Sequence, residues 1–176
     1  KRNSGREKVR QLGIKGEYAV FCPFTTRPQK HWFDRDWADL SFLISQVFKV
    51  PVLLLGGPAD FSHSQQIQEA SSANVYNLTG ETGLGESAAI VGEAKFVIGV
   101  DTGLTHLGVG FNRPTVALFG ATCPYLYTEG LQAKVLYHER SCSPCRRKPT
   151  CNGEYSCMQD HRPEHVIKAL GDLFGK

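Results

Sequence analysis

Three loops of this 176-residue chain carry side chains that could act on a phosphorylated ligand. The first, 23–32, places the hydroxyls of Thr25 and Thr26 shortly before Lys30. Hydroxyls, backbone amides and a lysine near the start of a helix are groups that bind phosphate. A polar loop that only caps the next helix has a similar composition, so the residues alone favour neither interpretation.

The second loop, 99–107, leads from an apolar run directly into a predicted helix. Asp101, Thr102 and Gly103 directly precede this helix, and His106 lies within its first turn. The N-terminal amides of a helix carry about half a positive charge, which favours a bound anion. Taken alone, these residues fit the plainer alternative better, in which Asp101 caps the helix and His106 is a hydrogen-bonded core histidine.

The third loop, 119–124, consists of small residues that allow a ligand to approach the backbone closely. A turn imposed by Gly120 and Pro124 explains this loop equally well. All three loops follow predicted strands, however, and open α/β sheets bind ligands outside the carboxyl ends of their strands. We therefore expect the three loops to form one shared crevice.

Short apolar runs alternate with helical patterns along the whole chain. The predicted strands are 18–22, 52–55, 75–78, 96–100, 115–119 and 135–137. The predicted helices are 34–48, 62–71, 85–92, 104–110 and 163–174. Neighbouring parallel strands must be joined by a crossover connection, which is usually a helix. The alternating order of strands and helices therefore predicts an α/β fold with a doubly wound, Rossmann-like parallel sheet. We expect that domain to cover 17–176, after a linker or helix at 1–16.

Four cysteines lie within a Cys-rich loop at 142–157: Cys142, Cys145, Cys151 and Cys157. Four thiolates at this spacing could hold a structural zinc ion, which would leave no open position for chemistry. The same cysteines could instead form two disulfides or remain reduced. Cys22 and Cys123 stand alone, and we expect both to fill the core.

Composition and charge exclude several classes of protein. A net charge of +3, from 20 basic and 17 acidic residues, is too mild to indicate nucleic-acid binding. The apolar run at 50–55 is far shorter than the roughly 20 residues of a membrane span. The Gly-x-Gly-x-x-Gly pattern of NAD-binding proteins is not present in the sequence, so we do not expect a dehydrogenase. Because the chain begins at Lys1, we expect it to be part of a longer protein.

The sequence resembles glycosyltransferase family nine, the heptosyltransferases that build the inner core of lipopolysaccharide. The Asp-Thr-Gly-Leu-Thr-His segment at 101–106 is the most specific part of the match. The resemblance extends from about Tyr18 to the terminal helix. Further matching segments are Thr25-Thr26, Lys30-His31-Trp32, Gly56-Gly57-Pro58, 94–100, Arg113-Pro114 and Leu118-Phe119-Gly120.

The resemblance implies a two-domain GT-B enzyme of which this chain is the C-terminal, donor-binding half. The donor would be a nucleotide sugar, ADP-heptose, and the transfer would invert the anomeric centre. The family's general base belongs to the other half, so this half alone is expected to be inactive. Its own contribution would be to stabilise the charge that builds on the departing diphosphate.

The resemblance also assigns roles to single residues. Thr25, Thr26 and Lys30 would hold the donor diphosphate, with Lys30 stabilising the leaving group. Asp60 would contact the ribose. The residues expected at the diphosphate and sugar end are Asp101, Thr102, Gly103 and His106.

A lipid-linked oligosaccharide acceptor, held by the N-terminal half, is the partner that the resemblance implies. The protein would be cytoplasmic and peripheral at the inner-membrane face. No metal ion is required for catalysis, since protein groups can stabilise the leaving diphosphate. Two alternative functions stay open, a non-catalytic nucleotide-binding module and a metal or redox protein centred on the cysteines.

Overall fold

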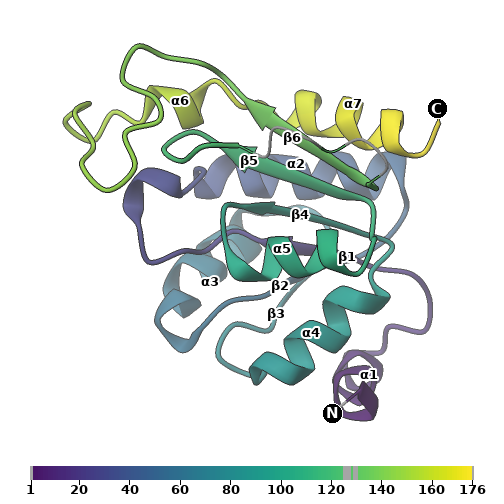
Figure 1. Cartoon of the computed structure of the whole chain (residues 1–176). Helices are drawn as coiled ribbons and strands as arrows, with labels where there is room; N and C mark the ends of the chain where they lie inside the picture. Colours follow the sequence, from purple (N-terminus) through teal and green to yellow (C-terminus); the bar gives the residue numbers. More distant parts are fainter. Residues whose placement is uncertain (1, 125–127, 129–130, 176) are drawn as a thin grey trace.

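A computed structural model describes residues 2–124, 128 and 131–175. Six strands form one sheet in the order β3-β2-β1-β4-β5-β6, and every neighbouring pair is parallel (Figure 1). The strands are β1 (Ala19–Cys22), β2 (Val52–Leu54), β3 (Val75–Asn77), β4 (Phe96–Val100), β5 (Thr115–Phe119) and β6 (Ala133–Tyr137). The predicted doubly wound α/β fold is confirmed.

Helices cover both faces of the sheet (Figure 1). On one face α2 (Asp34–Val47) packs against α3 (Phe61–Ala70) and α7 (Pro163–Leu173). On the other, α4 (Leu84–Glu93) packs against α1 (Arg2–Gln11) and α5 (Gly103–Gly110). The buried residues accordingly divide into two apolar clusters, one on each side of the sheet.

The central strands consist almost entirely of apolar residues because helices cover both of their faces. All residues of β1, β4 and β5 are buried. Their parallel register places Cys22 beside Gly99 and Gly99 beside Ala117, so the carboxyl ends of the three strands meet. A Cβ on Gly99 would lie 2.0 Å from the Thr105 hydroxyl, so the glycine allows α5 to pack directly on β4.

The predicted elements agree with the structure to within about two residues at each end. The spans 96–100 and 115–119 are reproduced, whereas β6 begins earlier than predicted, at Ala133. Within 1–16, α1 forms and buries Val9 against the fold. Three short helices were not predicted, since single turns show no apolar period: η1 (Pro28–Lys30), η2 (Pro58–Asp60) and α6 (Ser156–Gln159).

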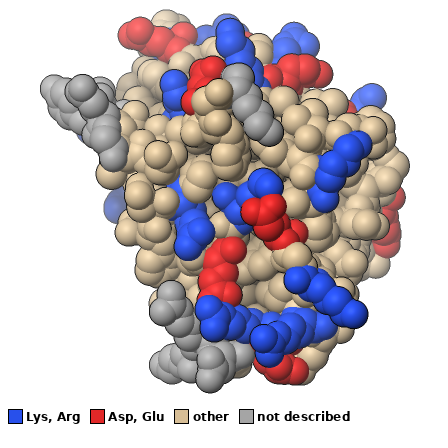
Figure 2. Space-filling model, turned by 90° about the vertical axis from the view of Figure 1, so that its right-hand side faces the viewer, with Lys and Arg blue, Asp and Glu red and all other residues tan. Residues whose placement is uncertain are grey.

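Figure 2 shows the side of the molecule that lies on the right in Figure 1, away from the Cys-rich loop. Lys and Arg side chains lie among Asp and Glu side chains there. Basic and acidic side chains also pair directly in the structure, as Arg6 does with Glu93 and Lys95 with Glu17. The charge of this face is therefore not of one sign, as the composition indicates.

Among the described helices, none has both the length and the apolar character needed to cross a membrane.

Candidate functional site

A cleft of about 780 Å³ opens at the carboxyl edge of the sheet. Its walls come from the loops after β1, β2 and β4 and from the start of α4. Five of the predicted site residues line it: Thr25, Thr26, Asp60, Thr102 and Gly103. This is the place where a parallel α/β sheet is expected to bind a ligand.

The other three predicted site residues are joined to each other beside this cleft, around Asp101. The Lys30 Nζ lies 2.6 Å from one carboxylate oxygen of Asp101, and the His106 Nε2 lies 2.9 Å from the other. The Thr122 hydroxyl donates to the same oxygen as Lys30, at 2.7 Å. One carboxylate therefore connects the loops after β1 and β5 to helix α5; we call these four residues the Asp101 cluster.

The ion pair at the centre of the cluster is only slightly accessible to solvent, with side-chain exposures of 16% for Lys30 and 15% for Asp101. The pKa of Asp101 lies well below its usual range, mainly because of the hydrogen bond from His106 and further because of those from Lys30 and Thr122; burial opposes the shift. Asp101 is therefore an anion at neutral pH. A phosphate that approaches Lys30 must share it with this carboxylate.

The start of α5 differs from the plainer alternative in the sequence prediction. The N-cap residue is Thr102 and not Asp101, and no side-chain cap bond is formed. His106 is also not a core histidine, since its side chain is 41% exposed. Asp101 and His106 instead bond to each other within the cluster. Thr102 and Gly103, at the N-terminal end of α5, line the cleft.

Asp60 has a structural role that the sequence did not predict. Its carboxylate accepts a hydrogen bond from the backbone N–H of Gly57 at 2.8 Å. This bond holds the short turn η2 after β2. Asp60 still lines the cleft, so contact with a ribose stays a prediction.

Thr122 is the member of the cluster that sequence reasoning did not single out. It lies in the third loop, after β5, where the composition indicates only a tight turn. The one feature of the sequence that could have pointed to Thr122 is its position shortly after the predicted strand 115–119. The partner that gives it a role, Asp101, is 21 residues away in sequence.

The cysteines are all free thiols in the described part of the chain, so the disulfide alternative is not realised there. Cys22 is buried as predicted, whereas the prediction for Cys123 is wrong, because it lies exposed in the loop after β5. No three His, Cys, Asp or Glu side chains among the described residues are grouped as a metal site requires. Zinc binding by the Cys-rich loop is therefore not preformed and stays a prediction.

Two thiols of the Cys-rich loop have raised pKa values. Burial raises the pKa of both Cys145 and Cys157, and the neighbouring thiols of the loop raise it further. Cys157 is buried in α6, while Cys142, Cys145 and Cys151 are partly exposed. These raised pKa values favour the protonated form of Cys145 and Cys157.

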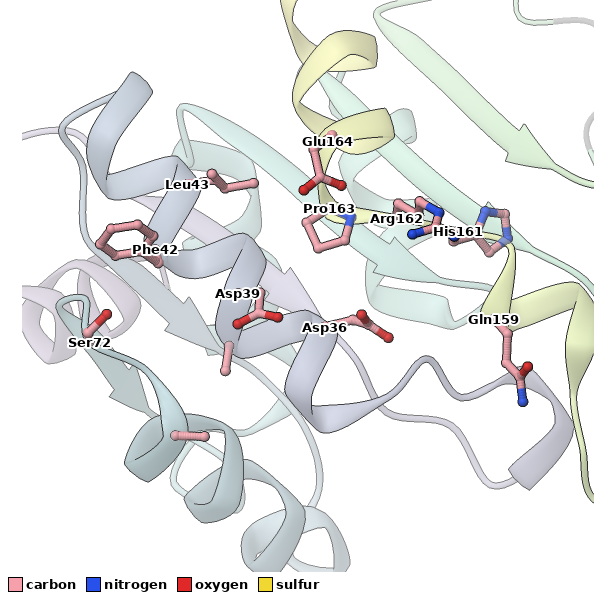
Figure 3. Close-up of a pocket in the computed structure, with 12 residues that line it drawn as sticks. Asp36, Asp39, Phe42, Leu43, Ser72, Gln159, His161, Arg162, Pro163 and Glu164 are labelled. Carbon is pink, nitrogen blue, oxygen red and sulfur yellow. The ribbon is translucent and has the colours of Figure 1, made fainter.

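A second cavity, of about 460 Å³, lies between α2 and α7. Figure 3 shows Asp36 and Asp39 on α2 across from Arg162 and Glu164 at the start of α7. Burial, with Asp39 as a further cause, raises the pKa of Asp36. This cavity is smaller and lies beside the helices. None of the predicted site residues lines it, so we assign the functional site to the larger cleft.

The resemblance to a known family is confirmed by comparison with known proteins. The profile of Glycosyltransferase family 9 (heptosyltransferase) matches residues 1–156. Lipopolysaccharide heptosyltransferase 1 of Salmonella typhimurium is 34% identical over 116 residues, which are 66% of this chain and 36% of that protein.

Solved structures show the same similarity. The glycosyl transferase family 9 structure from Veillonella parvula has a TM-score of 0.84 at 25% identity and covers 98% of this chain, which in turn covers 50% of it. E. coli heptosyltransferase WaaC with ADP-2-deoxy-2-fluoro heptose has a TM-score of 0.68 at 28% identity, covering 89% of this chain and 43% of its own. The chain thus spans half or less of these three relatives, and it belongs to glycosyltransferase family 9, the heptosyltransferase family.

Proposed function

We propose that this chain is the donor-binding half of an inverting glycosyltransferase that uses ADP-heptose in lipopolysaccharide core synthesis. The single observation that carries the proposal is the Asp101 cluster beside the 780 Å³ cleft. Together, the cluster and the cleft combine a lysine, hydroxyl groups and the N-terminus of α5 at one edge of the sheet, and these groups suit a diphosphate. The WaaC relative, solved with an ADP-sugar analogue, supports the choice of donor.

In the proposed reaction an acceptor hydroxyl attacks the anomeric carbon of the donor sugar. A new C–O bond forms while the bond from that carbon to the ADP oxygen breaks, so the configuration inverts. The acceptor proton passes to a carboxylate of the other half, and ADP leaves with the bonding electron pair. Lys30, the threonine hydroxyls and the first amides of α5 would stabilise the charge that develops on this leaving group.

Lys30 enters this step already paired with Asp101, at 2.6 Å. The pair keeps the ammonium group beside the cleft in the absence of ligand. Because Asp101 neutralises the charge of Lys30, the cluster holds Lys30 in place without binding other anions strongly. The developing negative charge of the diphosphate would then draw Lys30 further into the cleft.

The acceptor would be a lipid-linked oligosaccharide bound by an N-terminal half, and the enzyme would act at the cytoplasmic face of the inner membrane. The names of the relatives, which are lipopolysaccharide heptosyltransferases, support this assignment. The protein groups at the cleft can stabilise the diphosphate by themselves, so the proposal needs no catalytic metal ion.

Calorimetric titration of the chain with ADP, UDP, GDP and NAD tests the proposal. We expect selective binding of ADP, and about 10- to 100-fold weaker binding after Lys30→Ala, as for the loss of a charge-assisted contact. Lys95→Ala is the matched control, because Lys95 also pairs with a carboxylate, that of Glu17, but lies outside the cleft. Absence of nucleotide binding, or equal ADP affinity in the Lys30 variant, would contradict the proposal.

A further inference from the structure

The Cys-rich loop connects two loops of the functional site through the backbone of one residue. The carbonyl of Arg146 accepts a hydrogen bond from the Gln29 side-chain amide at 2.8 Å. The backbone N–H of Arg146 donates to the carbonyl of Ala121 at 2.6 Å. Arg146 therefore bridges the loop after β1 and the loop after β5.

These two loops are also the ones that meet at Asp101. Gln29 directly precedes Lys30, and Ala121 directly precedes Thr122. Lys30 and Thr122 both bond to the same oxygen of Asp101. The contacts thus close a ring, in which the two loops are joined on one side by the Asp101 carboxylate and on the other by the Arg146 backbone.

The bridge is built from buried and conformationally restricted groups. Gln29 is 5% exposed, so its amide depends on a protein partner. Arg146 has a left-handed backbone, with φ of 58°, and an exposed side chain, so its contribution to the ring comes from its main chain.

A second set of contacts fixes the loop after β5 against the Cys-rich loop. The Ser143 hydroxyl donates to the carbonyl of Gly120. A Cβ at Gly120 would lie 2.8 Å from the sulfur atoms of both Cys157 and Met158. The loop that carries Thr122 is thus packed between the start of the Cys-rich loop and α6.

We propose that Gln29 is a positioning residue for Lys30, and that the Cys-rich loop, through the Arg146 backbone, sets the spacing of the two loops that hold the donor phosphates. This inference rests on the proposed donor-binding function. A lysine ammonium is a point charge on a flexible stem, so its placement depends on the backbone that carries it. A misplacement of about 1 Å is enough to weaken a charge contact that acts on a reacting group.

Gln29→Leu tests the proposal, because it keeps the size of the side chain and removes the donor to Arg146. Gln68→Leu is the matched control, since the Gln68 amide also donates to a carbonyl, that of Val75 at 2.7 Å, from helix α3. We expect about fivefold weaker ADP binding for Gln29→Leu and no change for Gln68→Leu. Adenosine lacks the phosphates, so its affinity should be the same in both variants and the wild type.

Equal loss of ADP affinity in the two variants would overturn the proposal, as would an equal loss for adenosine and ADP in Gln29→Leu. A double-mutant cycle on unfolding in urea tests the ring without any nucleotide. Gln29→Leu and Thr122→Val should not be additive if the ring couples the two loops, and additive losses would overturn the proposal. Failure of the wild type to bind ADP would contradict the donor-binding function, while the cycle would still decide whether the ring exists.

Discussion

The Asp101 cluster and the Cys-rich loop lie at the same edge of the sheet but are held in different ways. The cluster depends on one charged carboxylate, that of Asp101, to which Lys30 and His106 both bond. The loop is attached by hydrogen bonds of the Arg146 backbone and the Ser143 hydroxyl, and the segment that follows the loop is held by His161, which is 1% exposed. Charge therefore sets the stability of the first region, whereas burial and main-chain geometry set that of the second.

The largest effect that we expect concerns the second region and pH. The His161 ring donates to the carbonyl of Phe119 at 2.8 Å, and burial lowers its pKa to about 4. The unfolded chain takes up a proton below about pH 6.5 and the folded chain only near pH 4, so stability falls as the pH falls through this window, by about 3 kcal/mol. His161→Gln should remove most of this loss, as measured by urea unfolding at pH 7 and pH 4. An unchanged pH dependence in the variant would show that burial of His161 does not limit the second region.

The next largest effect concerns the first region. Asp101→Asn removes the charge that Lys30 and His106 share, and should reduce the free energy of unfolding by about 2 kcal/mol, a value discounted for partial exposure. The pKa of Asp101 is lowered in the folded state, so its stabilisation is complete above the unfolded pKa of about 3.9 and is lost as the pH falls below it. Wild type and variant should therefore converge at low pH. A constant difference between pH 7 and pH 3 would mean that the contribution of Asp101 is not electrostatic.

A smaller effect should follow from Thr122→Val, which preserves shape and removes one donor to Asp101. The expected loss is about 1 kcal/mol, since the carboxylate keeps two other partners. Thr122→Ser retains the hydroxyl and should recover most of this loss in thermal unfolding. If the serine variant were no more stable than the valine variant, packing of the Thr122 methyl group would be the relevant contact.

The smallest effect should come from Cys142→Ser. The thiol is partly exposed and forms no disulfide, so stability should change by less than about 0.5 kcal/mol, and ADP affinity should remain nearly the same. Zinc analysis of the purified protein is the accompanying measurement. If the wild type contains stoichiometric zinc, and the variant loses both the zinc and much of its stability, the loop holds a structural metal ion. Charged thiolates would then stabilise the second region as well.

Much of the fold could be predicted from the sequence because buried parallel strands leave a strong local pattern. The spans 96–100 and 115–119 were predicted to the residue. Loops after such strands meet at one edge by the geometry of the sheet, which is why Thr25, Thr102 and Gly103 line one cleft. The third loop, 119–124, contributes no residue to the lining of that cleft. The roles of Cys123 and Asp60 were less accessible, since exposure and turn contacts depend on loop conformation.

The sequence by itself determined the alternation of strands and helices, the edge where polar loops gather, and the residue types available there. Tertiary structure alone decided the partners. Lys30 meets Asp101 across 71 residues, and Gln29 meets Arg146 across 117. The second contact uses a backbone carbonyl, a group that every residue has, so no choice of side chain at 146 could reveal it. Only the path of the folded chain selects which carbonyl lies beside Gln29.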